Sequence, residues 1–116
     1  KTYIISSRKK ELHNRLVQTP PARDWAMPVY HMYVVRAERR DDLQRFLKEK
    51  NIETGVHYPK PNHLQPAVVG LFQFVPKLPR TEQAVKEILS LPIHGEMTLD
   101  AADTVCDAIA EFYGRK

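Results

Sequence analysis

Two imidazole rings and a phenol lie close together in a proline-rich stretch near the middle of the chain, GVHYPKPNHLQP at residues 55–66. His57, Tyr58 and His63 can each form hydrogen bonds with a hydroxyl or phosphate group of a ligand. The three prolines of the stretch fix their own φ angles and favour extended geometry in the residues before them. A segment that is rigid before a ligand arrives loses less conformational entropy on binding.

Two interpretations of this stretch follow from its residue types. In the first, it is a preformed binding loop that presents its rings to a ligand. In the second, it is a structural edge loop whose rings pack on Trp25 or Phe72. Both interpretations are compatible with the residue types, and they stay open at this point.

Other residues that could carry chemistry form no complete set. His57 and His63 have no cysteine partner nearby, and neither they nor His31 and His94 occur in an HExxH pattern. Cys106 falls on the apolar face of a predicted helix, which is typical of a small core residue and not of an activated nucleophile. The four glycines are scattered, so there is no glycine-rich phosphate loop. We therefore predict no metal site and no catalytic residue in this chain.

Length and composition fit one globular domain. The chain has 116 residues, of which 42% are hydrophobic and 28% are charged, as is ordinary for a soluble domain with a single core. No apolar run is long enough for a membrane-spanning helix, and no secretory signal pattern opens the sequence. One cysteine forms no disulfide framework. We therefore expect a cytoplasmic protein with no membrane partner.

Charge gives little support for a nucleic-acid partner. The net charge is +4, and the one basic cluster is Arg8, Lys9 and Lys10, with Arg15 nearby. Aromatic side chains are not interleaved with this cluster, as they often are on single-strand-binding surfaces. A solvated helical face explains the cluster, and we expect no nucleic-acid binding.

The opening third of the chain predicts a helix, a connector and a strand. Residues 4–17 carry a helical pattern, and a proline-containing extended connector follows them. Residues 27–37 are apolar or aromatic on both alternating faces, which predicts a central strand buried on both sides. His31 lies within this strand, and we expect its ring to be packed and hydrogen-bonded beside the core. Lys rather than Met at position 1 leads us to expect a processed product or a piece of a longer chain.

The middle of the chain predicts a helix and a short second strand. Residues 38–51 have helical spacing, and Asn51 is a plausible stop. Residues 52–58 read as the strand, with Gly55 where the chain bends or another backbone approaches. Residues 67–74 fit either a short helix or a loop that covers the core. The inward stripe of the helix comprises Leu43, Phe46 and Leu47.

The last third predicts a helix, a short strand and a final helix. Thr81 is the expected N-cap of a helix at residues 81–90, and residues 91–94 form the strand. Thr98 opens the last helix, which runs to residue 113. The apolar sets of the two helices are Ala84, Val85, Ile88 and Leu89 in the first and Leu99, Val105, Cys106, Ile109, Phe112 and Tyr113 in the second. Few short strands among several helices predict a small α+β sandwich in which helices cover a sheet.

Three segments of the sequence resemble a known family in order and spacing. They read YHMYVVR, LKEKNIETGVHYPKPNHLQPA and PRTEQAVKEILSLPIHGEMT, and the likeness extends over residues 28–113. They are similar to the C-terminal part of the DegT–DnrJ–StrS family of pyridoxal-phosphate (PLP) aminotransferases, which act on nucleotide-linked keto-sugars. The resemblance implies a linking helix and connector at residues 1–27 and an aminotransferase small domain at residues 28–116. It also implies a largely antiparallel sheet covered by helices.

The resemblance further implies the reaction and the partners. The full enzyme of such a family transfers an amino group, from a donor such as glutamate, to a keto-sugar in cell-surface polysaccharide or secondary-metabolite biosynthesis. Its cofactor is PLP, held by a lysine of a large domain in the same polypeptide, and it works as a homodimer. No segment of this chain matches the large-domain motifs, so we expect the isolated chain to bind no PLP and to be inactive.

The resemblance gives the proline-rich stretch a role. It implies that His57 and Tyr58 face the nucleotide-sugar substrate, that His63 lies close by on the same loop, and that these residues orient sugar or phosphate groups. The SLP sequence at residues 90–92 resembles a structural strand entry and receives no chemical role. The alternative is a regulatory or sugar-binding module of the same fold that has lost catalysis.

Overall fold

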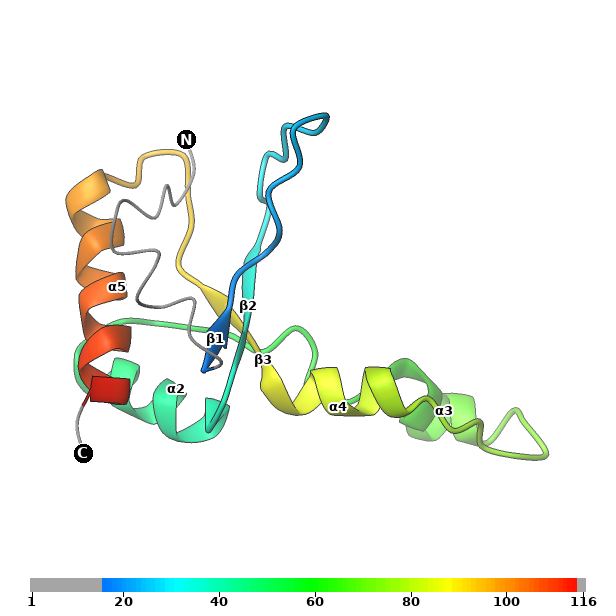
Figure 1. Ribbon diagram of the computed structural model, residues 1–116. Coiled ribbons are helices and arrows are strands. Elements are labelled where there is room, and N and C mark those ends of the chain that lie inside the picture. The colour runs from blue at the N-terminus through cyan, green and yellow to red at the C-terminus, as the bar shows by residue number, and fades with distance from the viewer. Residues whose placement is uncertain (1–15, 115–116) are drawn as a thin grey trace.

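The computed structural model describes residues 16–114 (Figure 1). The predicted helix at residues 4–17 lies outside this range except for its last two residues, and Val17 belongs to a strand. In chain order the elements are β1 (Val17–Gln18), β2 (Tyr33–Ala37), α2 (Arg40–Glu49), the 3₁₀ helix η1 (Asn62–Leu64), α3 (Pro66–Val69), α4 (Pro79–Glu87), β3 (Ile88–Leu91) and α5 (Leu99–Gly114). None of the helices in the described range is long and apolar enough to span a membrane.

The sheet is small and antiparallel, in the order β1-β2-β3, as expected. β2 is its central strand, and Val35 pairs with Leu89 of β3. Tyr33, Val35 and Ala37 are buried whereas Arg36 is exposed, so the strand is buried on one face only and the prediction of burial on both faces is wrong.

The predicted strand also began too early. The side chain of Val29 is 93% exposed, and His31 is exposed as well, so His31 is not packed beside the core. The apolar pattern of residues 27–32 does not make a strand because these residues belong to a loop that projects from the sheet (Figure 1). The prediction made from the apolar residue types therefore gave β2 too many residues and too much burial.

Helices α2 and α5 cover the buried face of the sheet and contact each other. Leu43 and Leu47 of α2 have no exposed surface and meet Val35 and Leu89 in the core. Residue Asn51 has a φ of 61°, which ends α2 as predicted. At the other end of α2, the Arg40 guanidinium donates hydrogen bonds to the carbonyl oxygens of Val85 in α4 and of Ile88, the first residue of β3, at 3.0 and 2.7 Å.

Helix α5 begins as predicted but buries a narrower face. The Thr98 hydroxyl accepts a hydrogen bond from the Ala101 N–H at 3.1 Å, so Thr98 is its cap. Leu99 is 66% exposed, contrary to its predicted place in the apolar set. Cys106 is half-buried and packs against the core, as expected.

The boundary between α4 and β3 differs from the prediction. The helix begins at Pro79, which occupies its first turn, so Thr81 lies inside the helix and is not its cap. Ile88 and Leu89 belong to β3 and not to the helix. Pairing with β2 ends α4 at Glu87, because hydrogen bonds and burial in the sheet outweigh two more residues of helix. Residues 92–94 are consequently beyond the strand.

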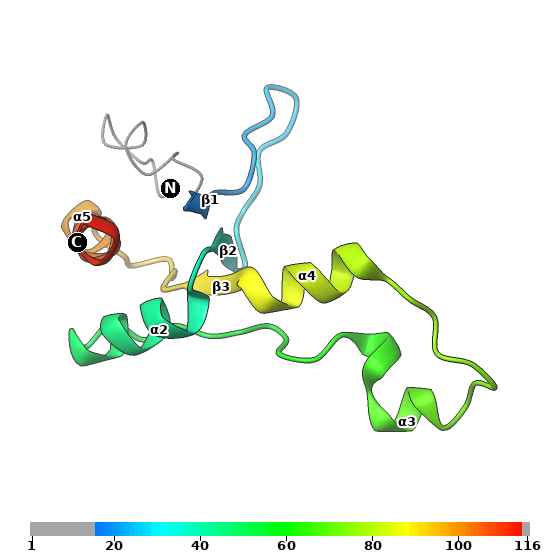
Figure 2. The same cartoon turned by 60° about the horizontal axis from the view of Figure 1, so that its bottom comes forward.

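Two segments project from this core (Figure 2). Residues 19–32 form the first, and residues 57–78, which we call the arm, form the second. The arm contains α3 followed by an irregular loop, and Figure 1 shows it extending away from the sheet, so residues 67–74 do not cover the core. Leu71, Phe72 and Phe74 of the arm are 81%, 57% and 71% exposed.

Substitution of a buried leucine is expected to affect the free energy of unfolding far more than substitution of an exposed leucine in the arm. Leu89→Ala is expected to lower the free energy of unfolding by about 2–5 kcal/mol, because a fully buried leucine leaves a cavity. Leu71→Ala, in the exposed arm, should change it by less than about 0.5 kcal/mol. Urea unfolding of both variants measures this difference, and equal losses would contradict the assignment of the core.

Candidate functional site

The proline-rich stretch is attached to the core at its first residue. Gly55 and Ser90 exchange backbone hydrogen bonds, at 3.1 Å from the Gly55 N–H and 2.7 Å from the Ser90 N–H. This single bridge replaces the short strand predicted at residues 52–58. The stretch therefore leaves the sheet beside β3 and runs outward along the arm.

His57 is held by Ser90 while part of its ring remains exposed. Its Nδ1 atom lies 2.9 Å from the hydroxyl oxygen of Ser90, whose side chain is buried. A Cβ atom at Gly55 would lie 2.8 Å from Cε1 of His57, so the glycine makes room for the imidazole. The Tyr58 ring, 67% exposed, meets the His57 ring edge-on at a centroid distance of 5.6 Å. The two rings form an exposed aromatic pair on a fixed base.

Trp25 and Phe72 do not provide the packing that the structural interpretation required. The His57 ring contacts the Tyr58 ring and the Ser90 hydroxyl. Trp25 lies at the end of the first projecting segment and is 85% exposed, and Phe72 is 57% exposed. The edge-loop interpretation in that form is wrong.

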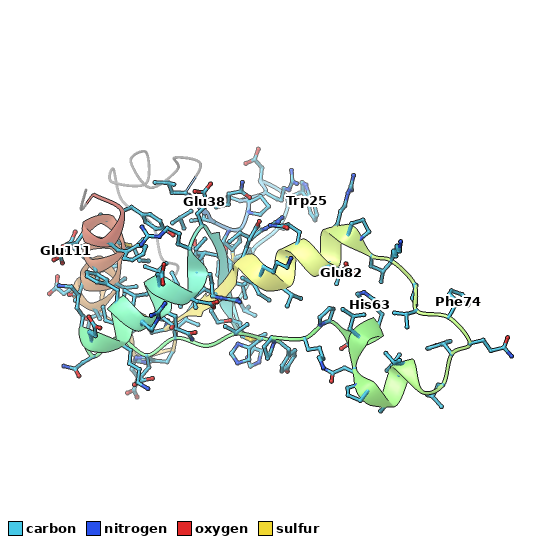
Figure 3. All side chains as sticks on the ribbon, turned by 90° about the horizontal axis from the view of Figure 1, so that it is seen from below. Trp25, Glu38, His63, Phe74, Glu82 and Glu111 are labelled. Atoms are coloured by element: carbon cyan, nitrogen blue, oxygen red, sulfur yellow. The ribbon has the colours of Figure 1, made fainter. Side chains whose placement is uncertain are left out.

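His63 lies in a different environment from His57. It belongs to η1, only 8% of its surface is exposed, and its Nε2 atom is 2.9 Å from a carboxylate oxygen of Glu82 in α4. Figure 3 shows the two side chains facing each other between η1 and α4. Two hydrogen bonds hold the pKa of Glu82 below its ordinary value. The one from His63 has the larger effect, and the one from the Leu78 N–H has the smaller effect. His63 therefore fastens the arm to α4.

Two open grooves flank the stretch, and His57 lines both. The first also contains His31, Glu53 and Ser90, beside the end of β3. The second lies between residues 57–62 and α4. Its lining comprises His57, Tyr58, Lys60, Pro61, Asn62, Arg80, Thr81, Ala84, Val85 and Ile88.

The partners of the predicted site residues could not be predicted from the sequence. Ser90 received no chemical role, yet its hydroxyl holds His57. Glu82 and Arg80 come next to the loop only because α4 folds back beside the arm. A single sequence carries no signal for which distant positions come into contact. The helical spacing of residues 81–90 predicted a helix, but not that this helix lies beside the loop. In the part of the chain that the structure describes, no group of three or more metal-ligating side chains is found.

The fold and the sequence define the class of protein. A profile of the DegT/DnrJ/EryC1/StrS aminotransferase family matches residues 2–110. The chain belongs to this family.

Individual relatives agree with the family assignment. A pleiotropic regulatory protein of Geobacillus stearothermophilus is 47% identical over 98 residues, which are 84% of this chain and 26% of the relative. A dTDP-3-amino-3,4,6-trideoxy-alpha-D-glucose transaminase of Streptomyces venezuelae is 42% identical over 88 residues, covering 76% of this chain and 23% of the relative. The chain thus spans about a quarter of the length of these relatives.

A solved structure confirms the fold. The structure of S. venezuelae DesV in complex with a ketimine intermediate superimposes with a TM-score of 0.83 at 35% identity. The match covers 94% of this chain and 29% of that one. The small antiparallel sheet with its helices is therefore shared with the DesV structure.

The close approach of Gly55 to His57 gives a test of the site geometry. Gly55→Ala is expected to displace the His57 imidazole and break its hydrogen bond to Ser90, because the added Cβ would lie 2.8 Å from Cε1. The ring can move, so the fold should persist. NMR of the imidazole nitrogens measures the change. Gly95→Ala is the matched control because nothing lies within 4 Å of its added Cβ, and unchanged His57 signals in Gly55→Ala would contradict the geometry.

The His63–Glu82 contact predicts a pH dependence. The folded-state pKa of Glu82 is lowered, so the stabilisation from this pair is present above the ordinary glutamate pKa and is lost as the pH falls through the lowered one. His63→Ala should raise the pKa of Glu82 towards its ordinary value, measured by NMR titration of the Glu82 carboxyl. His94→Ala, which removes an exposed histidine, should leave it unchanged. A Glu82 titration that is identical in the His63 variant would rule out the contact.

Proposed function

We propose that this chain is the C-terminal small domain of a PLP-dependent aminotransferase that acts on a nucleotide-linked keto-sugar. Membership of the family carries the proposal, since the profile matches residues 2–110. The names of two relatives support it: a transaminase of a dTDP-linked amino sugar and a UDP-2-acetamido-2-deoxy-3-oxo-D-glucuronate aminotransferase. The amino donor in this proposal is glutamate, and the product enters cell-surface polysaccharide or secondary-metabolite synthesis.

The cofactor would be held outside the residues described. PLP requires a lysine for its Schiff base and usually an acidic partner for its ring nitrogen. Neither of the two grooves that His57 lines contains both a lysine and a carboxylate, so these residues do not fit PLP. In the proposed enzyme a large domain of the same polypeptide supplies the cofactor site, the enzyme is a cytoplasmic homodimer, and the isolated chain is inactive.

The residues of this chain would bind and orient the substrate. His57 and Tyr58 have exposed rings on a fixed backbone, so they can donate hydrogen bonds to sugar or phosphate oxygens without first becoming ordered. His63 is assigned to the same substrate-binding loop. Because its ring is buried against Glu82, its contribution in this proposal is to hold the loop in place.

A second function is favoured by one observation. The relative that is 47% identical is named a pleiotropic regulatory protein, which agrees with a regulatory or sugar-binding module that lacks catalysis. The two proposals differ in one measurable respect. An aminotransferase forms a Schiff base with PLP and a binding module does not, so the PLP absorbance of the longer protein that contains this segment separates them.

The proposed role of His57 is tested in that longer protein. His57→Ala is expected to lower kcat/KM for the sugar substrate by about tenfold, equivalent to about 1.4 kcal/mol for one lost hydrogen bond. The PLP absorbance should stay unchanged, because His57 does not hold the cofactor in this proposal.

His94→Ala is the control for this experiment, since His94 is exposed and lines neither groove. Its kinetics should match those of the unaltered protein. Unchanged kinetics of His57→Ala would remove His57 from the substrate site, and loss of the PLP absorbance would assign it a different role.

A further inference from the structure

Ser90 places a nearly buried hydroxyl group beside the candidate site. Its side chain is only 7% exposed, and its neighbours in β3, Leu89 and Leu91, belong to the core. Because successive side chains of a strand point to opposite faces, the Ser90 hydroxyl lies on the face of the sheet away from the core. The backbone bridge between Ser90 and Gly55 brings the proline-rich stretch to the same place.

The His57 ring is seated on Gly55 with one nitrogen engaged and one free. A Cβ atom at Gly55 would lie 2.8 Å from Cε1 of the ring and 3.5 Å from each ring nitrogen. The Nδ1 atom lies 2.9 Å from the Ser90 hydroxyl oxygen. The Nε2 atom has no hydrogen-bond partner among residues 16–114. Nε2 is therefore the ring nitrogen that remains for a ligand.

The direction of the hydrogen bond between Ser90 and His57 follows from the burial of Ser90. A hydroxyl has one proton to donate, and a neutral imidazole has one N–H and one nitrogen that accepts. In the part of the chain that the structure describes, the Ser90 hydroxyl meets no acceptor other than Nδ1. If Nδ1 carried the proton, the nearly buried hydroxyl proton would have no acceptor. A buried donor without an acceptor destabilises the folded state, so Ser90 donates to Nδ1.

No other described side chain competes for the ring nitrogens. Tyr58 meets the His57 ring edge-on, with 5.6 Å between the ring centroids. None of the charged or titratable side chains in the two grooves forms a hydrogen bond with His57 within the range 16–114. These side chains are His31, Glu53, Tyr58, Lys60 and Arg80.

We propose that Ser90 is a positioning residue that fixes the tautomer of His57. By donating to Nδ1, Ser90 keeps the proton of the neutral ring on Nε2, so an N–H is the group that His57 offers to the grooves that it lines. His57 then selects a ligand oxygen that accepts a hydrogen bond, such as that of a carbonyl or a hydroxyl, and rejects a ligand donor at this position. That the oxygen belongs to a keto-sugar rests on the proposed function, whereas the tautomer does not.

NMR spectra that correlate the ring nitrogens with the ring carbon-bound protons measure the tautomer in the 116-residue chain. They are recorded at about pH 9, well above the ordinary histidine pKa of about 6.5. For His57 the Nε2–H form is expected to exceed the Nδ1–H form by at least about tenfold, equivalent to about 1.4 kcal/mol.

His94 is the internal control for these spectra. It is exposed, and its ring has no hydrogen-bond partner in the described residues. It should show the mixture of an unrestrained histidine, in which the Nε2–H form is only moderately favoured. A His57 ring with the same mixture as His94, or with the Nδ1–H form in excess, would overturn the proposal.

Two variants separate the hydroxyl of Ser90 from its packing. Ser90→Ala removes the hydroxyl, so His57 is expected to change to the tautomer mixture of His94. Ser90→Thr keeps a hydroxyl, and threonine suits a strand, so the Nε2–H form should persist. Backbone amide spectra check that both variants are folded. An unchanged tautomer of His57 in folded Ser90→Ala would contradict the role of Ser90.

Kinetics of the longer protein that contains this segment test whether Ser90 acts through His57. Ser90→Ala is expected to lower kcat/KM for the sugar substrate by about threefold, because only part of the protein then offers the N–H in the productive arrangement. In a His57→Ala background the same substitution should cause no further loss. Equal losses in both backgrounds would show that Ser90 does not act through His57.

The spectra need neither cofactor nor substrate, so their outcome is separable from that of the proposed function. A fixed tautomer that depends on Ser90, in a protein that transfers no amino group to a sugar, would support the role of Ser90 and reject the aminotransferase. Amino transfer by a protein whose His57 ring is a mixture of tautomers would do the reverse.

Discussion

The antiparallel pairing of β2 with β3 joins two parts of the chain that are distant in sequence, and it places Val35 opposite Leu89. Both side chains point into the core beneath α2 and α5, where they meet Leu43 and Leu47. The same pairing ends α4 at Glu87 and directs that helix away from the sheet. Without it, neither side of the groove between residues 57–62 and α4 would have a fixed position.

The consequences of that pairing reach the candidate site through Ser90. This residue follows Leu89 in β3, and its backbone bonds to Gly55 while its hydroxyl meets His57. One strand thus contributes a core residue and the support of an exposed histidine at adjacent positions, because successive side chains of a strand point to opposite faces. The site is hydrogen-bonded to β3 where it joins the core, and a second contact, between His63 and Glu82, holds it further out.

The two projecting segments carry exposed apolar side chains. Met27 and Val29 on the first projecting segment are 95% and 93% exposed, and Leu71 and Phe74 on the arm are 81% and 71% exposed. Exposed apolar patches of this kind often mark interaction surfaces. The chain spans about a quarter of the length of its relatives.

The sequence by itself determined the fold class, the inward face of α2, part of that of α5, the cap at Thr98 and the stop at Asn51, because periodicity and capping are local properties. It also predicted a candidate site in the stretch that contains His57, Tyr58 and His63. The tertiary structure decided the rest: the length of β2, the end of α4 at the sheet, the exposure of His31, and the partners Ser90 and Glu82. These depend on which distant segments pair and on what covers each face, and helical or strand spacing in a single sequence records neither.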